Sequence, residues 1–153
     1  MSSFCIESEF DAKECEREVC MSRSLIQVVN SSAQTVAAGG VLDLGTTIRR
    51  YGCNCRLNGN AVELQGEGYY VVDGAVTVAP TAAGNVQVAV YVNGVPLTGV
   101  VATEAATAGG AVTLPLVGTI RQGCCCDSSD NVTLVLVSGA GTVSNVSLRI
   151  VKT

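Results

Sequence analysis

Hydrophobic and polar residues alternate with a period of two along most of the chain after residue 24. Successive side chains of a β-strand point to opposite faces of its sheet, so this pattern predicts half-buried strands. The apolar positions that share a phase in the three clearest runs are Tyr70, Val72, Val76 and Val78, then Val86, Val88, Val90 and Val92, and finally Val146, Leu148 and Ile150. The run VTLVLV at 132–137 is apolar in both phases and predicts a central strand covered on both faces.

Turn signals separate these runs at intervals of about 8 to 12 residues, which is typical of an all-β sandwich or barrel. Asn58-Gly59 and Asn93-Gly94 predict type I′ hairpin turns, because Asn and Gly tolerate positive φ at both central positions. We expect a two-sheet jelly-roll sandwich of about eight to ten antiparallel strands. The provisional strands are Leu25–Val29, Val41–Arg49, Ala61–Leu64, Gly68–Val78, Asn85–Val92, Ala111–Val117, Val132–Val137 and Val143–Val151.

Residues 1–24 differ in kind from the rest, since they carry six acidic residues and three cysteines. Within them, Glu9 to Met21 could form a short helix that places Phe10, Cys15 and Val19 near one face. Two interpretations stay open, a frayed and solvated terminus or an attachment arm that orders only against a partner. We therefore divide the chain into a charged arm at 1–24 and a jelly-roll domain at 25–153.

Composition narrows the class of protein. The 153 residues are 48% hydrophobic and 14% charged, which suits one domain with a substantial core. The net charge is −4 and no basic patch is present, which argues against nucleic-acid binding. The sequence begins without the basic start and apolar run of a signal peptide, and no apolar stretch is long enough to span a bilayer. We expect synthesis and assembly in the cytosol, where thiols stay reduced, and no membrane partner.

The central part of the chain resembles the tumour-necrosis-factor/complement-like jelly rolls of Firmicutes and their phages. Relatives of that kind include the C-terminal domain of collagen-like spore-surface glycoproteins and small phage structural proteins. The resemblance covers roughly residues 25–152. It is carried by Val62-Glu63-Leu64 with Gly66, by Gly68-Tyr69-Tyr70-Val71-Val72, by Val86–Val92 with Asn93-Gly94 and Val95-Pro96, and by Cys124-Cys125-Cys126 with Asp127-Ser128-Ser129.

This resemblance implies a homotrimer of ten-stranded jelly rolls that serves display or adhesion and not catalysis. The chain departs from the collagen-like relatives because it has no Gly-X-Y repeat, so a collagen stalk is absent. The charged arm takes the place of the stalk, and we expect it to anchor the domain. The pattern of apolar residues also favours an oligomer, independently of the resemblance. Strands that are apolar on both faces need a second cover, and a neighbouring copy is an economical one.

Two cysteine groups stand out, the pair Cys53 and Cys55 and the triplet Cys124, Cys125 and Cys126. Neighbouring Cα atoms lie about 3.8 Å apart, below the usual disulfide range, so the triplet is not expected to bond to itself. Three interpretations stay open. All five cysteines are small, buried, reduced hydrophobes; or the pair forms disulfides with the triplet; or the five hold a soft metal such as Zn²⁺.

The arm carries the remaining cysteines, Cys5, Cys15 and Cys20, which are candidates for cross-links that lock an assembly outside the cell. No catalytic residue is assigned. Histidine is absent, which excludes His-dependent triads, and no Gly-rich stretch is followed by the Lys-Ser/Thr of a phosphate loop. We expect no cofactor, apart from the metal that the cysteines could hold.

The first hypothesis for function is a non-enzymatic structural virion protein, a phage head fibre or capsid decoration subunit, found on the particle. Its partners would be two further copies of itself and a capsid or other virion protein that binds residues 1–24. One alternative is a tip module that recognises a receptor or a host-surface glycan. Another is a self-assembling spore or surface appendage whose subunits are linked by disulfides.

Overall fold

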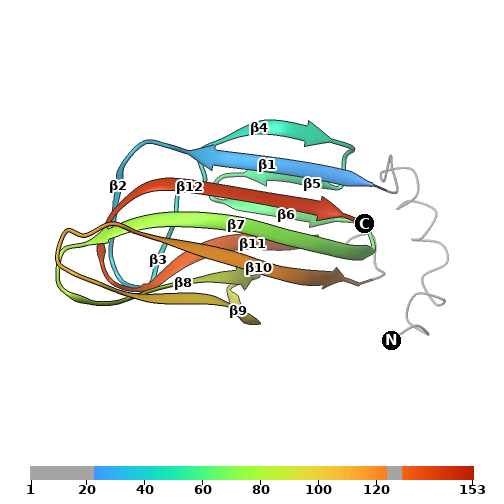
Figure 1. Ribbon diagram of the computed structural model, residues 1–153. Coiled ribbons are helices and arrows are strands. Elements are labelled where there is room, and N and C mark those ends of the chain that lie inside the picture. The colour runs from blue at the N-terminus through green and yellow to red at the C-terminus, as the bar shows by residue number, and fades with distance from the viewer. Residues whose placement is uncertain (1–22, 124–128) are drawn as a thin grey trace.

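The computed structural model describes residues 23–123 and 129–153, and every regular element within them is a β-strand (Figure 1). The strands form two six-stranded sheets, in which all pairs are antiparallel. Sheet A consists of β1 (Ser24–Asn30), β2 (Gln34–Val36), β4 (Thr46–Tyr51), β7 (Gly68–Pro80), β10 (Val112–Gln122) and β12 (Gly141–Lys152). Sheet B consists of β3 (Gly40–Val41), β5 (Cys55–Asn58), β6 (Ala61–Gln65), β8 (Gly84–Val92), β9 (Val95–Ala106) and β11 (Ser129–Ser138).

The strand order crosses the sequence order in both sheets. Sheet A runs β10-β7-β12-β1-β4, with β2 paired to β12, and sheet B runs β5-β6-β11-β8-β9, with β3 paired to β11. β1 begins opposite the end of β12, where Ser24 pairs with Lys152 (Figure 1). We call this end of the sandwich, where β1 begins, the terminal end. The two-sheet jelly roll predicted from the sequence is confirmed.

The core lies between the sheets and is made by the predicted alternation. Tyr70, Val72, Val76 and Val78 of β7 are fully buried, as are Val86, Val88 and Val90 of β8 and Val146, Leu148 and Ile150 of β12, whereas Val92 is half-buried. The run 132–137 forms β11, the central strand of sheet B. On its second face Val135 is only 5% exposed, while Thr133 and Val137 are half-buried. The chain itself therefore covers the middle of that face, and no second copy is required at Val135.

Two local predictions are wrong. The segment Val41–Arg49 was expected to be one strand, but 42–45 belong to no strand because side chains satisfy their backbone: Asp43 N–H donates to Gln34 Oε1 at 2.9 Å, and Gly45 N–H donates to Asp43 Oδ1 at 2.9 Å. The Asn58-Gly59 turn is also different. Asn58 is the last residue of β5, and of the residues at this turn only Gly59 has positive φ, as a type II′ turn requires. At Asn93-Gly94 both residues have positive φ, as predicted.

The first strand begins at Ser24, and the helix predicted for Glu9–Met21 lies outside the described residues. Three strands were not expected from the sequence. They are β2, β5 and the long edge strand β9.

Candidate functional site

The outer face of sheet A carries a continuous apolar row. Val71 pairs with Val151, Val151 with Leu25, and Leu25 with Tyr51, so the four residues cross four adjacent strands at one level. The residues on either side of Val71, Val151 and Leu25 are buried, which turns these three side chains away from the core, and Tyr51 pairs with Leu25 on the same face. Tyr51 is 57% exposed and Val71 is 37% exposed. We call these four residues the apolar row.

A polar row crosses the same strands two residues away, formed by Asp73, Arg149, Gln27 and Arg49. Arg149 Nη2 lies 3.0 Å from Asp73 Oδ2. Both side chains are about half exposed, so the pair adds at most about 1 kcal/mol to stability. With Gly74, Ala75 and Ser147, part of this row lines a shallow hollow of about 290 Å³.

Other large apolar side chains extend this face. Four of the eight exposed large hydrophobic residues of the described part lie on this face: Tyr51, Tyr69, Val71 and Val117. The guanidinium of Arg121 stacks over the Tyr69 ring at 5.0 Å and also pairs with Glu67 at 3.2 Å. Scattered apolar side chains are normal on a surface, but an aligned group across one sheet face indicates a protein contact.

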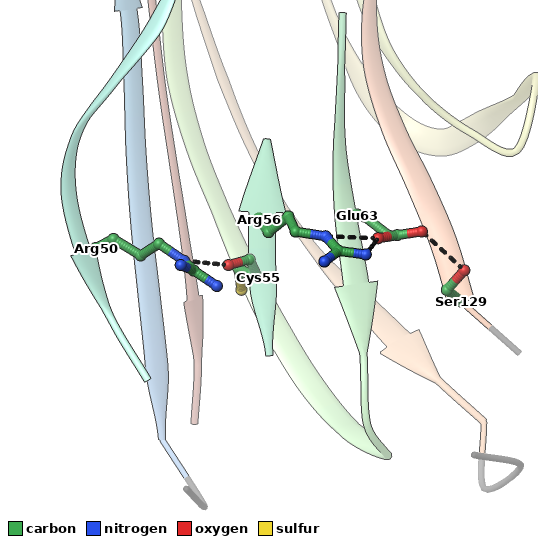
Figure 2. A network of polar contacts seen from close by, with 5 residues as sticks. All are labelled: Arg50, Cys55, Arg56, Glu63 and Ser129. Carbon is green, nitrogen blue, oxygen red and sulfur yellow. Dashed lines mark hydrogen bonds and ion pairs between the residues drawn. The ribbon is translucent and has the colours of Figure 1, made fainter. Parts of the chain in front are cut away.

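At the terminal end, one arginine joins the two sheets. Arg50 pairs with the buried Ile26, which turns its side chain to the core side of β4 at the edge of sheet A. Its Nε donates to the carbonyl of Cys55 on β5, the edge of sheet B, at 2.9 Å (Figure 2). Arg56 and Glu63 form an ion pair of 2.7 Å nearby, and the Ser129 hydroxyl approaches the same carboxylate at 3.4 Å (Figure 2). Arg50, Arg56 and Glu63 lie with Cys53 and Cys55 around a polar hollow of about 210 Å³.

Asn54 connects Ser24 of β1 with Gln65 of β6 through hydrogen bonds, a role that the sequence did not predict. Its N–H donates to Ser24 Oγ at 3.1 Å, while that hydroxyl donates to Asn54 Oδ1 at 2.6 Å. Its Nδ2 and its carbonyl bond the backbone of Gln65 on β6. Asn54 and Ser24 are both buried, so each polar group is satisfied where water is excluded. The position between two cysteines gave no signal of this role.

Two buried titratable groups lie near this end. Burial raises the pKa of the Cys55 thiol to about 12, although Arg50 and Lys152 act in the opposite direction. Burial also raises the pKa of Tyr70, with further contributions from Cys55 and Asp130. Tyr70 Oη lies 2.8 Å from the carbonyl oxygen of Gln65 and 2.7 Å from that of Gly66. Both groups are neutral at physiological pH, so neither is a ready nucleophile.

The structure separates the predicted cysteine pair. Cys55 is a buried free thiol, as the interpretation of small reduced hydrophobes expects, whereas Cys53 is disulfide-bonded and does not fit that interpretation. A disulfide sulfur is not a thiolate, so Cys53 in this state offers no metal ligand. The triplet Cys124, Cys125 and Cys126 and the arm residues Cys5, Cys15 and Cys20 lie outside the described residues.

Within 23–123 and 129–153, no group of three or more His, Cys, Asp or Glu side chains is arranged to hold a metal ion. A search of the same residues finds no helix with the length and hydrophobicity that a membrane crossing needs. Two features of the described surface stand out. One is the apolar row on the outer face of sheet A, and the other is the terminal end, where hydrogen bonds of Arg50 and Asn54 connect neighbouring elements.

Comparison with known proteins agrees with the architecture. No protein-family profile and no curated protein sequence matches the chain. Solved structures do match. Murine APRIL superimposes with a TM-score of 0.67 at 14% identity, over 86% of this chain and 99% of its own. The globular domain of zebrafish complement 1qA gives a TM-score of 0.63 at 7% identity, over 83% of this chain and 94% of its own. The chain folds as a tumour-necrosis-factor-like jelly roll.

A further solved structure with this fold is a vertex protein. The vertex protein P5 of PRD1 superimposes with a TM-score of 0.56 at 12% identity, over 85% of this chain and 96% of its own. Identities this low show a shared fold and leave partners to be argued from the chain's own surface.

Proposed function

We propose that this tumour-necrosis-factor-like jelly roll is a non-enzymatic structural subunit of a phage particle, a head fibre or capsid decoration protein. Three copies associate through the outer faces of sheet A, and residues 1–24 dock the trimer on a capsid or other virion protein. The observation that carries the oligomer is the apolar row formed by Val71, Val151, Leu25 and Tyr51. The PRD1 vertex protein supports the assignment to a particle, as a protein of the same fold.

A second copy explains the apolar row better than a small ligand does. The row spans four strands, and the hollow beside it is shallow and polar, unlike the concave apolar pockets that hold small molecules. Closed symmetry is the usual outcome when identical chains associate. The half-exposed Asp73 and Arg149 beside the row supply the polar contacts that such interfaces carry around their apolar centre.

The charge of the arm suits it to bind a basic surface on the particle and not another copy of sheet A. Residues 1–22 hold six of the thirteen acidic residues and only two basic ones, whereas residues 23–153 carry seven of each and are neutral. The acidic charge is thus concentrated in the part of the sequence that precedes β1. A basic surface on the particle would attract it, and the attraction would weaken with salt.

Particle binding tests the proposal. Purified protein is mixed with phage particles from the host lineage, and bound protein is measured after sedimentation and by immunogold labelling. We expect the whole chain to label particles at regular positions, with binding reduced at high salt, and a chain lacking residues 1–22 to stay in solution as a trimer. Binding that persists without the arm would overturn the docking role, and a whole chain that labels no particle would overturn the virion assignment.

A further inference from the structure

The sequence contains two Asn-Gly pairs, Asn58-Gly59 and Asn93-Gly94, and the structure restrains them to very different degrees. In such a pair the glycine nitrogen attacks the asparagine side chain readily, because glycine has no Cβ that obstructs the approach. The reaction needs a side-chain amide that is free to rotate and a backbone that can turn toward it. These two conditions separate the two pairs.

Asn93 is held by three hydrogen bonds to the neighbouring strand β11. Its Nδ2 donates to Asp130 Oδ1 at 2.9 Å, and its Oδ1 accepts from the Asn131 N–H at 2.8 Å. Its own N–H donates to the carbonyl of Asn131 at 2.8 Å. Both ends of the side-chain amide are therefore engaged, and Cγ cannot turn toward the nitrogen of Gly94 until these bonds break. Asn93 also directly follows β8, an inner strand of sheet B.

Asn58 has none of these restraints. Its side chain is exposed and forms no hydrogen bond with any residue in 23–123 or 129–153. It is the last residue of β5, a four-residue strand at the edge of sheet B, where it pairs with Ala61. Gly59 has a φ of +64°, and no described atom lies within 4 Å of a Cβ placed on it. The space around its nitrogen is open, and only the end of a short edge strand has to open for the backbone to turn.

We propose that Asn58 is a site of spontaneous deamidation and that the fold protects Asn93 from the same reaction. The Gly59 nitrogen gives up its proton to solvent and bonds to Cγ of Asn58. The bond from Cγ to Nδ2 then breaks, and the side-chain nitrogen takes a proton and leaves as ammonia. One water molecule opens the resulting five-membered succinimide at either carbonyl, which gives aspartate or isoaspartate at position 58. No oxidant or reductant takes part, and the inference is independent of the proposed function.

The product alters the outer face of sheet B beside an ion pair. Asn58 and Arg56 are alternate residues of β5 and share this face, on which Arg56 lies 2.7 Å from Glu63. Deamidation places a second carboxylate on the same strand, two residues from Arg56. Isoaspartate also adds a carbon atom to the backbone, so the two-residue turn no longer matches the pairing of Asn58 with Ala61. The modified chain is therefore more acidic, and its β5–β6 hairpin is less stable.

Mass spectrometry compares the two pairs within one chain. The folded whole chain is incubated at mildly alkaline pH, sampled over time and digested with trypsin and a glutamate-specific protease. These enzymes place Asn58 in peptide 57–63 and Asn93 in peptide 68–104, and fragment ions assign each conversion to one asparagine. Because each of three hydrogen bonds slows the opening by a factor of roughly 2 to 10, we expect Asn58 to convert at least about tenfold faster than Asn93. Equal rates, or faster conversion of Asn93, would overturn the proposal.

Unfolding the wild-type chain in guanidinium chloride is the control, because it frees both pairs. The two rates should then become similar, and a tenfold difference that persists in denaturant would contradict the structural explanation. Conversion of Asn58 in denaturant but not in the folded chain would show that the fold protects both pairs, and the proposal would fail.

The variant Asp130→Ala tests the protection of Asn93 separately. It removes the acceptor of Asn93 Nδ2, so conversion at Asn93 should become faster in the folded chain while conversion at Asn58 stays the same. An unchanged rate at Asn93 in the folded variant would show that its side-chain bond to Asp130 does not protect it.

Discussion

Gly118 of β10 lies directly against Val100 of β9, at the edge where sheet A meets sheet B. A Cβ on Gly118 would overlap the methyl groups of Val100, and Val100 is 5% exposed. We expect Gly118→Ala to lower the free energy of unfolding by about 1–3 kcal/mol, because a β-branched side chain in a packed core cannot easily move aside. Urea unfolding measures the loss. Gly123→Ala is the matched control, since no atom of the described residues lies within 4 Å of its added methyl group, and equal losses in both variants would refute the packing argument.

Tyr70 offers a second test of the interior. The side chain is fully buried, and its hydroxyl is within hydrogen-bond distance of the carbonyl oxygens of Gln65 and Gly66. Tyr70→Phe leaves these acceptors without that donor, so we expect a loss of about 1–3 kcal/mol in unfolding free energy. Tyr69→Phe, at the neighbouring position that is 56% exposed, should change stability by less than about 0.5 kcal/mol. Comparable losses at the two tyrosines would show that the buried hydroxyl bond does not stabilise the fold.

The raised pKa of Cys55 predicts a pH dependence of stability. Burial raises the pKa of the folded thiol to about 12, whereas the unfolded thiol ionises near its ordinary pKa of 9.0. The unfolded state therefore loses a proton first, and the stabilising contribution, complete below about pH 9, is lost as pH rises toward 12. We expect the stability difference between wild type and Cys55→Ala to shrink between pH 8 and pH 10.5 in urea unfolding. A difference that stays constant over this range would contradict the buried, neutral thiol.

A single charged substitution tests whether the apolar row is the contact between copies of the chain. Val71→Asp places a carboxylate where a second copy is expected to exclude water, so we expect the trimer to dissociate at least tenfold more readily. Val95→Asp is the control, because Val95 is more exposed, at 62%, and lies on β9 of sheet B. Sedimentation velocity over a concentration series measures both. Dissociation caused equally by the two variants would mean that sheet A is not the specific contact.

Most of the fold could be predicted from local alternation, because burial on one face of a strand is recorded in every second residue. The long strand β7 shows this directly, since the predicted inward residues from Tyr70 to Val78 are fully buried. The alternation also led to a wrong prediction at Leu42 and Leu44, which were expected to lie in a strand. Both are fully buried as the pattern requires, but the Asp43 N–H between them donates to the side chain of Gln34 at 2.9 Å and to no neighbouring strand. Hydrophobic phase reports burial and not backbone pairing.

β9 was missed for the opposite reason. It contains Pro96 and Gly99 and a run of small residues, and most of its side chains are exposed because it is the edge of sheet B. An edge strand needs no apolar phase to be held by its neighbour. The candidate site was less predictable still. The apolar row exists only because β7, β12, β1 and β4 are adjacent in that order, which depends on contacts between distant parts of the chain.

The molar mass of the purified protein in solution tests most directly the central claim, which is that three copies associate through sheet A. Light scattering coupled to gel filtration, on the oxidised whole chain at micromolar concentration, should give three times the 15.6 kDa of one chain. The mass should stay the same after reduction, because the apolar row and not a disulfide holds the copies together. A stable mass of one chain under these conditions would contradict the account, since the outer face of sheet A would then have no partner of its own kind.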